Sequence, residues 1–430
     1  MAAIRSRQQV EVMRHSVPYK GGQQSFRTDA ACTVIENRMP VTGRPGEIIL
    51  GAMARPLASP SFKDFASDSR KLVFVLCDGT RPTPTALVLK AMHHDIRKHA
   101  GARFVIATGT HRAPTEHELG GIFGALLDEL RPRISVHDAR DSTNLEYLGK
   151  TSRGTPVSIS RTVMEADGIV TINSVEPHYF AGFTGGRKSF LPGVAGYESI
   201  ERNHSHAAEP SSEPLALAGN PVSEDMEEAF GLVSGKRIFS VQTVTLPDGS
   251  LFSAYAGNLK EAFNRAVADS AGIYSVEVGQ RFNIVVTAAP PPMDRDLYQA
   301  QKAMEHARLV LEPGGIMILV ASCWDGIGDR GFYDLLASPE SDRGIDAHLG
   351  AGYRLGNHKA ARWLTLAKQA SLWAVTELDE RVLRTTRMRG FRSVQDALDD
   401  AVLRIRSSGR EPTVGILPGG SYTVPRTVMR

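Results

Sequence analysis

The sequence contains few cysteines, no long apolar run and no excess of charge of one sign. Its three cysteines, Cys32, Cys77 and Cys323, lie far apart and form no CxxC pair, which indicates buried free thiols in a reducing compartment. No segment approaches the roughly 18 apolar residues of a membrane-spanning helix, and residues 1–20 have no apolar stretch of the secretory type. We therefore expect a soluble cytoplasmic protein with no membrane partner.

Positive and negative charges are nearly balanced. The 50 Lys+Arg and 47 Asp+Glu residues give a net charge of +3 with histidine neutral. This is too small for a dedicated nucleic-acid binder, and no Lys/Arg block reaches the length of a basic tail, so no nucleic-acid partner is expected. With 42% hydrophobic and 23% charged residues the composition is globular. At about 100 to 200 residues per domain, the length predicts two or three domains.

Buried strands alternate with a helix in the first third of the chain. LVFVLC at 72–77 predicts a strand that ends at Cys77, residues 83–99 have apolar positions near helical spacing, and RFVIATGT at 103–110 predicts a second strand. A β-α-β unit of this kind implies a parallel sheet. Similar apolar runs recur at 167–174, 283–290, 315–322 and 413–420. The predicted fold class is α/β.

The predicted domain boundary falls near residue 272. A helical pattern precedes it, and NIVVTAAPPP at 283–292 begins a new α/β series after it. We therefore expect an N-terminal domain over 20–271 and a C-terminal α/β domain over 272–410, with the segment 411–430 returning to the first domain.

Polar residues follow three of the predicted strands. Ligands of parallel sheets bind outside the carboxyl ends of the strands. Asp78, Thr80 and Arg81 follow the first strand, His111 follows the second, and His178 follows the third. Histidine titrates near neutrality and suits acid–base catalysis, and an arginine can bind a carboxylate or phosphate through two hydrogen bonds. Helix and turn caps are the structural alternative for each of them.

The richest segment is 176–206, EPHYFAGFTGGRKSFLPGVAGYESIERNHSH. Its glycines, Gly186 among them, allow backbone N–H groups to approach an anion, and Lys188 adds a positive charge or a nucleophile for a carbonyl-type cofactor. The segment is not a Walker A loop, because Arg187 replaces the glycine that precedes the lysine in that motif. His204 and His206 are too close in sequence to bind one metal together, but one of them can supply a single imidazole.

A further helix is predicted within 294–311. Tyr298 and Lys302 are four residues apart and share one face of it. They reach a ligand if that face borders a cleft, and are ordinary surface residues if it does not.

These motifs together resemble the nickel-dependent lactate racemase family. The resemblance rests on CDGTRPTP at 77–84, GTHR at 109–112, EPHYFAGFTGGRKSFLPG at 176–193, ERNH at 201–204 and LYQAQKA at 297–303, in this order between about residues 20 and 420. The central segment is the most specific. The family has two α/β domains around an interdomain cleft, so the resemblance implies the same architecture here.

The resemblance also implies a cofactor and a site. The cofactor is a nickel-pincer nucleotide, a pyridinium-3,5-bisthiocarboxylic acid mononucleotide that binds nickel, attached covalently to Lys188. His204 is the implied nickel ligand, and His111 and His178 the implied catalytic acid/bases. Arg81 and Lys302 match the positions that bind the substrate carboxylate. The implied neighbours of the cofactor are Asp78, Thr80, Gly186, Tyr298 and Gln299.

The implied enzyme is an isomerase, a racemase or epimerase of a 2-hydroxy acid that is lactate-like or larger. Removing the α-proton would place a second negative charge beside the carboxylate, whereas hydride transfer to the cofactor, coupled to proton transfer by a histidine, gives a flat 2-keto acid. Hydride return to the opposite face inverts the centre. The implied partners are the substrate and the cofactor-synthesis enzymes of the host. Phe180, Phe183, Tyr298 and Trp324 are candidates for a wider substrate pocket, and Arg187 and Phe190 lie beside the attachment point.

Two other interpretations remain open. The same histidines could hold zinc in a hydrolase or lyase, which would be active with zinc alone. Alternatively, the glycine-rich segment could bind a nucleotide in a non-catalytic carrier protein, in which the histidines are structural. Loss of turnover in a histidine variant that still binds the cofactor would contradict the carrier interpretation.

Overall fold

The computed structural model describes residues 13–233, 235–338 and 353–428. The chain forms two compact units. Unit 1 takes its described residues from Met1–Asn37, Ser275–Gly352 and Lys359–Arg430, and unit 2 from Arg38–Tyr274 and Tyr353–His358. The two are described separately.

Unit 2 is built on a six-stranded sheet. The strand order is β13-β12-β9-β4-β5-β6, and β13 is antiparallel to β12 while the other neighbours run parallel. The strands are β4 (Leu72–Cys77), β5 (Arg103–Ala107), β6 (Ile134–Val136), β9 (Gly168–Ser174), β12 (Arg237–Thr245) and β13 (Leu251–Gly257). Because β4 lies between β5 and β9 in parallel register, the carboxyl ends of these three strands are adjacent.

Helices cover both faces of this sheet, as a parallel sheet requires. On one face α1 (Pro45–Ala54) and α3 (Thr85–Ile96) pack over apolar strand residues such as Phe74 and Phe104. On the other face, the alternate strand residues Val73 and Val75 join a core with residues from the glycine-rich segment and from α7 (Tyr197–Ser205) and α8 (Pro221–Gly231). A further helix, α9 (Leu259–Tyr274), contacts β12 and β13.

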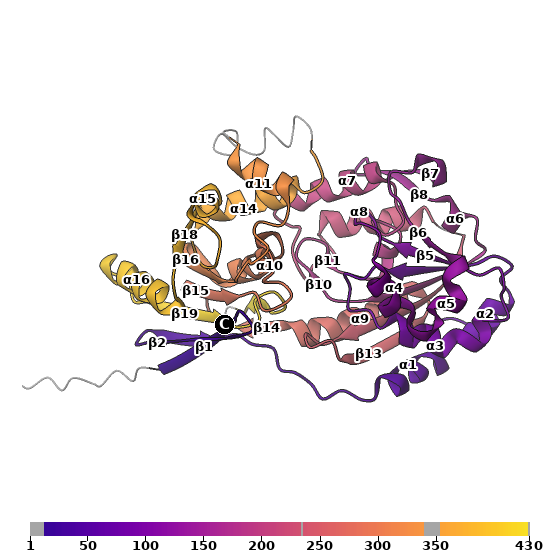
Figure 1. Cartoon of the computed structure of the whole chain (residues 1–430), viewed down its shortest axis with the longest axis horizontal. Helices are drawn as coiled ribbons and strands as arrows, with labels where there is room; N and C mark the ends of the chain where they lie inside the picture. Colours follow the sequence, from indigo (N-terminus) through magenta and orange to yellow (C-terminus); the bar gives the residue numbers. More distant parts are fainter. Residues whose placement is uncertain (1–12, 234, 339–352, 429–430) are drawn as a thin grey trace, which may run out of the picture. The chain divides into compact units, whose positions relative to one another are not determined.

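Unit 1 contains a second six-stranded sheet, and its neighbouring strands are all parallel. The order is β18-β17-β16-β15-β19-β3. The strands are β3 (Ala31–Val34), β15 (Phe282–Ala288), β16 (Leu311–Val320), β17 (Ser371–Val375), β18 (Met388–Phe391) and β19 (Thr413–Leu417). A hairpin of β1 (Met13–Tyr19) and β2 (Gly22–Thr28) and a parallel pair of β14 (Ser275–Val278) and β20 (Val424–Thr427) complete the strands of the unit (Figure 1).

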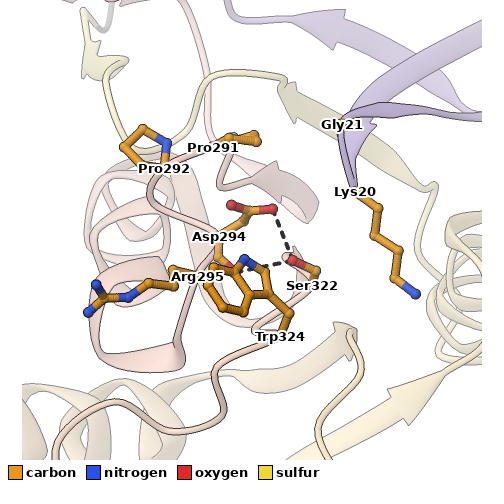
Figure 2. Close-up of a pocket in the computed structure, with 8 residues that line it drawn as sticks. All are labelled: Lys20, Gly21, Pro291, Pro292, Asp294, Arg295, Ser322 and Trp324. Carbon is orange, nitrogen blue, oxygen red and sulfur yellow. Dashed lines mark hydrogen bonds between the residues drawn. The ribbon is translucent and has the colours of Figure 1, made fainter.

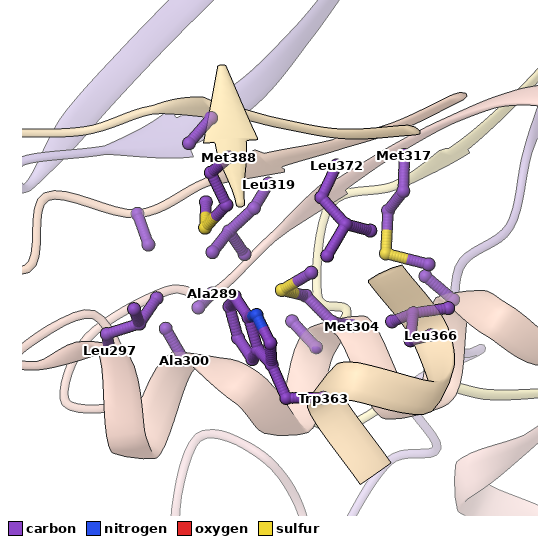
Figure 3. Packing of buried hydrophobic residues seen from close by; sticks show 14 of the residues in the cluster. Ala289, Leu297, Ala300, Met304, Met317, Leu319, Trp363, Leu366, Leu372 and Met388 are labelled. Carbon is purple, nitrogen blue, oxygen red and sulfur yellow. The ribbon is translucent and has the colours of Figure 1, made fainter. Parts of the chain in front are cut away.

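Alternate residues of the unit 1 strands enter separate cores. Val285, Met317 and Leu319 pack with α10 (Leu297–Ala307) and α14 (Asn357–Gln369), where the indole of Trp363 lies near Met304 (Figure 3). The intervening residues, including Ile284 and Ile318, pack against α16 (Val394–Ser407). This period-two alternation places helices on both faces of the sheet.

The predicted α/β class with mainly parallel sheets is confirmed. The predicted strands at 72–77, 103–110, 167–174, 283–290, 315–322 and 413–420 correspond to β4, β5, β9, β15, β16 and β19. The helices predicted at 83–99 and 294–311 correspond to α3 and α10.

The two ends of the chain differ from the sequence expectation. The C-terminal strand β19 pairs with β15 and β3, and β20 pairs with β14, so both terminal segments belong to unit 1 and not to the N-terminal domain. The physical reason is that β19 completes the same parallel sheet as the apolar runs of β15 and β16. None of the helices in the described part of the chain has the length and apolar character needed to cross a bilayer.

Candidate active site

The ends of β4 and β5 bring Asp78 and His111 into contact. Asp78 follows β4 and is only 7% exposed. Its Oδ2 lies 2.7 Å from Nδ1 of His111, which belongs to the loop after β5. Its Oδ1 accepts hydrogen bonds from the backbone N–H of Thr80 at 3.1 Å and from the Thr80 hydroxyl at 2.6 Å. Two polar groups expected from their place after strands therefore form one network, in which Asp78 is buried and His111 is half exposed.

The electrostatics of this network set the state of His111. Burial raises the pKa of Asp78, but the hydrogen bond and charge of His111, with help from Thr80 and Arg81, outweigh it and leave the pKa below its usual value. Asp78 is therefore ionised, so the hydrogen bond assigns the proton of the imidazole to Nδ1. Nε2 of neutral His111 then carries a lone pair and is able to accept a proton.

His178 has the opposite arrangement. It lies in a short hairpin of β10 (Pro177–His178) and β11 (Gly182–Phe183). The backbone N–H of Ala181 donates to its Nδ1 at 3.3 Å. An accepting Nδ1 carries no proton, so neutral His178 has its proton on Nε2, where it is able to donate. The ring packs at 4.5 Å, centroid to centroid, edge-on against Phe180.

Lys188 lies in the short 3-10 helix η4 (Gly186–Ser189). Burial lowers the pKa of its ammonium well below the usual lysine value, and the charges of Arg81 and Arg187 lower it further. Its amine is therefore held toward the neutral, nucleophilic form.

Buried side chains of two strands fix the turn that carries Lys188. Gly186 has φ +54°, and a Cβ there would lie 2.7 Å from the ring of Phe263, so no other residue fits without displacement. Its N–H donates to Oε1 of Gln242 on β12 at 3.0 Å. Ser189 donates to Oδ1 of Asn173 on β9 at 2.6 Å. Gln242 is a functional neighbour that sequence reasoning missed, because nothing in its local sequence marks it.

The ring of Phe180 connects the principal residues of unit 2. Lys188 Nζ lies 5.9 Å from its centroid, and the imidazole of His204, on α7, lies edge-on at 5.2 Å. Burial lowers the pKa of His204 well below the usual histidine value, and the charges of Lys188, His358 and His111 lower it further. The carbonyl of Ile200 raises the pKa, but this effect is smaller than that of burial. His204 is thus held neutral, as a metal ligand must be. The candidate residues of unit 2 therefore converge.

His358 is a neighbour that the sequence did not reveal. Its Nε2 lies 3.1 Å from the hydroxyl of Tyr179, and its Nδ1 lies 2.7 Å from the hydroxyl of Tyr353. The ring packs at 5.0 Å from Phe180 and 6.1 Å from His204. It belongs to the short segment Tyr353–His358, which joins unit 2 from far along the chain, so no local motif could have indicated it.

The residues that flank Lys188 have structural roles. Arg187 is 2% exposed, and its Nη2 donates to the carbonyl of Ala181 at 3.2 Å and to the hydroxyl of Ser223 on α8 at 2.9 Å. Burial lowers the pKa of its guanidinium to about 10. Phe190 is fully buried and packs 5.2 Å from Phe230. Phe183, a candidate for the pocket, is also buried, at 1% exposure.

The remaining candidates lie in unit 1. Asp296 caps α10 by accepting the N–H of Gln299 at 2.8 Å. Tyr298 and Lys302 share one partly buried face of the helix, and Lys302 Nζ lies 3.6 Å from the sulfur of Met293. Burial raises the pKa of the Tyr298 phenol to about 12, so it remains a hydrogen-bond donor at neutral pH.

The chemistry of the unit 2 residues fits a covalently attached, metal-bearing group. Lys188 offers a neutral amine, and the buried Nδ1 of His204 forms no well-aligned hydrogen bond in the described structure. A single imidazole suits nickel, zinc or copper. In the described ranges, no group of three or more His, Cys, Asp or Glu side chains is placed to hold a metal ion. One histidine is enough to complete the coordination of a metal that a cofactor holds.

Comparison with known proteins shows the family to which the chain is related. Residues 21–214 match the family model for the lactate racemase N-terminal domain, and residues 279–424 match that for the lactate racemase C-terminal domain. A lactate racemase of Thermoanaerobacterium thermosaccharolyticum is 32% identical over 67% of this chain and 68% of its own length. One from Lactiplantibacillus plantarum is 29% identical over 69% of this chain and 70% of its own.

Solved structures give the same result. The lactate racemase apoprotein from T. thermosaccharolyticum superposes with a TM-score of 0.87 at 27% identity, covering 96% of this chain and 100% of that one. A protein from Thermotoga maritima shares the fold with a TM-score of 0.65 at 18% identity, over 90% of this chain and 100% of its own. The two family models together cover most of the chain, and on this ground the chain belongs to the lactate racemase family, a family of isomerases.

Proposed function

We propose that this protein racemises or epimerises a 2-hydroxy acid, lactate or a larger relative, with a nickel-pincer nucleotide attached covalently to Lys188. The observation that carries the proposal is the convergence of Lys188 and His204 on the ring of Phe180, both with lowered pKa values. The named relatives are lactate racemases, which supports racemisation of a lactate-like acid.

Each residue has a role that its surroundings support. Lys188 attaches the cofactor, and His204 supplies the protein ligand to its nickel. Asp78, Thr80, Gly186, Tyr298 and Gln299 are assigned to positioning the cofactor. When bound, this group supplies a hydride acceptor that a protein side chain cannot provide. Arg81 and Lys302 are assigned to the substrate carboxylate, because a guanidinium and an ammonium hold an anion in place while the chemistry proceeds.

The two histidines are in complementary states. Inverting a 2-hydroxy carbon requires one base to take the hydroxyl proton on one face and an acid to return a proton on the other. Asp78 accepts from Nδ1 of His111 and leaves Nε2 of the neutral ring able to accept the hydroxyl proton. His178 returns a proton from Nε2 as an imidazolium, because a neutral ring that lost its proton would be left as an imidazolate. After one turnover their states are exchanged, and the enzyme is ready for the opposite enantiomer.

The first test is the mass of the Lys188 peptide. The protein is co-produced with the cofactor-synthesis enzymes of a lactate racemase producer, beside the variant Lys188→Ala and a lactate racemase as positive control. We expect a cofactor-sized, sulfur-bearing adduct on Lys188 in the parent protein only. An unmodified lysine, under conditions that modify the positive control, contradicts the proposal and returns the zinc and carrier interpretations.

The histidines provide a second test. His111→Ala and His178→Ala are each expected to lower turnover about 10²- to 10⁴-fold, because each removes one proton-transfer group. Activity is measured by chiral chromatography of 2-hydroxy acids, with the Lys188 adduct quantified in the same samples. Unchanged turnover in either variant contradicts the assigned role, and loss of the adduct would instead indicate a structural role.

A further inference from the structure

A cavity of about 480 Å³ opens in unit 1 at the carboxyl ends of β15 and β16 (Figure 2). Pro291 and Pro292 line it from the loop after β15, and Ser322 and Trp324 from the loop after β16. Lys20 reaches it from the turn between β1 and β2. The carboxyl edge of a parallel sheet is where α/β domains bind small ligands. The cavity has the position and the size of a ligand site, and the proposed function assigns it no role.

The backbone beside the cavity is strained at two points. Lys20 has φ +52°, and Cys323, directly before Trp324, has φ +50°. Left-handed conformations are unfavourable for a non-glycine residue and cluster at functional sites. Two of the five described non-glycine residues with positive φ therefore flank this one cavity.

The side chains of the cavity combine an aromatic face with a buried acceptor. Trp324 is 64% exposed, whereas Asp294 is 5% exposed. The hydroxyl of Ser322 donates to Oδ2 of Asp294 at 2.9 Å. Figure 2 shows the carboxylate, the hydroxyl and the indole close together. An exposed indole beside a buried carboxylate provides both a stacking surface and a strong hydrogen-bond acceptor.

Charged side chains of both signs lie around the cavity. Lys20 forms an ion pair with Glu377, and Arg295 contacts Asp296 at 3.0 Å and Asp325 at 3.6 Å. An anion entering the cavity would meet Asp294, and a cation would meet Lys20 and Arg295. A neutral group whose hydroxyls both donate and accept is compatible with all three.

We propose that this cavity binds the vicinal hydroxyls of a polyhydroxylated molecule, with Asp294 accepting hydroxyl protons, Lys20 and Arg295 donating, and the C–H face of the ligand packed on Trp324. The hydroxyls could come from a free sugar or polyol, or from the chain of a sugar acid. The proposal rests on the geometry of this cavity and is independent of the cofactor on Lys188.

Tryptophan fluorescence provides a direct test, because the other two tryptophans, Trp363 and Trp373, are at most 2% exposed. The full-length protein, produced without cofactor-synthesis enzymes, is titrated with D-glucitol, D-gluconate and L-lactate. We expect saturable emission changes with glucitol and gluconate in the millimolar range, and none with lactate, which lacks a polyol chain. Binding of gluconate without glucitol would identify the acid as the source, and equal binding would identify the polyol alone.

Variants distinguish the cavity from other surfaces. Isothermal titration calorimetry, which does not depend on the indole, is expected to show about tenfold weaker polyol binding in Trp324→Ala and about 10- to 100-fold weaker binding in Asp294→Asn. Leu403→Ala, on α16, removes an equally exposed apolar side chain, at 64% exposure, and is expected to bind normally. Because Trp324 is exposed, Trp324→Ala is expected to fold normally. This variant therefore tests the proposal even if Asp294→Asn does not fold.

The proposal is overturned if neither glucitol nor gluconate binds saturably. It is also overturned if lactate binds as well as they do, or if affinity is unchanged in Trp324→Ala.

Discussion

Each unit of this protein contains a lysine whose pKa lies well below the usual value, and the surroundings of the two lysines differ. Lys359, in unit 1, is 5% exposed, donates to the carbonyl of Tyr298 at 2.6 Å, and lies 3.3 Å from the centroid of the Tyr298 ring. Lys188, in unit 2, lies over Phe180 and has two arginines as its nearest charges.

The difference shows that burial alone does not make an amine reactive. Burial lowers the pKa of both lysines. At Lys359 the charge of Lys302 lowers the pKa further, but Asp296, Glu305 and Asp329 act in the opposite direction. A carbonyl and an aromatic face also hold the Lys359 ammonium. At Lys188 the neighbouring charges act with burial instead of against it. A buried lysine held by a carbonyl and an aromatic ring stabilises the packing around it, whereas the arginines near Lys188 favour its neutral amine, as the proposed covalent role requires.

The largest expected effect comes from exchanging the lysines for uncharged residues. In protein co-produced with the cofactor-synthesis enzymes, Lys188→Ala is expected to lower racemisation by on the order of 10³-fold or more, beyond most single acid–base groups, because the cofactor is not attached. Lys359→Met is expected to retain the adduct on Lys188 and to lower the free energy of unfolding by about 1 to 3 kcal/mol, since the Tyr298 carbonyl loses its donor.

Peptide mass and urea denaturation measure these two outcomes. An adduct that disappears in Lys359→Met, in a protein that remains folded, would show that the distinction between the lysines is wrong.

Removing one of the anions that raise the pKa of Lys359 makes its surroundings more like those of Lys188. Glu305 on α10 is 3% exposed and pairs with Arg362 at 2.7 Å and Arg308 at 3.0 Å. Glu305→Gln removes the carboxylate from both of these buried ion pairs, so the free energy of unfolding is expected to fall by about 3 to 5 kcal/mol. Glu380→Gln, in an exposed pair with Arg384, is the matched control and is expected to change it by at most about 1 kcal/mol.

The lowered pKa of Glu305 makes the free energy of unfolding depend on pH. Burial raises its pKa, but the charges and hydrogen bonds of Arg362 and Arg308 outweigh burial and lower it to about 2. A group whose pKa is lower in the folded state stabilises the fold above its unfolded pKa, about 4.5 here, and loses that contribution as the pH falls toward 2. As the pH falls toward 2, the free energy of unfolding measured in urea should therefore fall by about 3 kcal/mol less in Glu305→Gln than in the parent. Equal acid sensitivity would contradict this assignment.

Sequence patterns predicted the elements whose structure depends mainly on their own local sequence. The continuous apolar runs of β4, β9 and β15 have no alternative to a buried strand, and the glycine-rich segment marked Lys188. His358 and Gln242 were missed because each reaches the site through tertiary contacts alone. The short β3, with mostly exposed residues, has no apolar pattern, so its pairing with β19 depends on sheet geometry that the sequence does not display locally.

The smallest expected effect concerns chemical labelling of the two lysines. With trace acetic anhydride at pH 7, Lys188 is expected to react about tenfold faster than an exposed lysine such as Lys63, because more of its amine is neutral. Lys359 is expected to react slowest, since the Tyr298 ring covers it. Peptide mass spectrometry follows the rates from pH 7 to 10, over which an ordinary lysine accelerates and Lys188 reaches a plateau. A steady rise for Lys188 would contradict its lowered pKa.

The segment Tyr353–His358 is synthesised after the rest of unit 2. Every other residue of unit 2 precedes Ser275, so Lys188 and His204 have left the ribosome before His358 is synthesised. At about 5 to 20 residues per second the interval is on the order of ten seconds. During translation Lys188 therefore exists first without the imidazole of His358, which later packs on Phe180 and contacts the hydroxyls of Tyr179 and Tyr353.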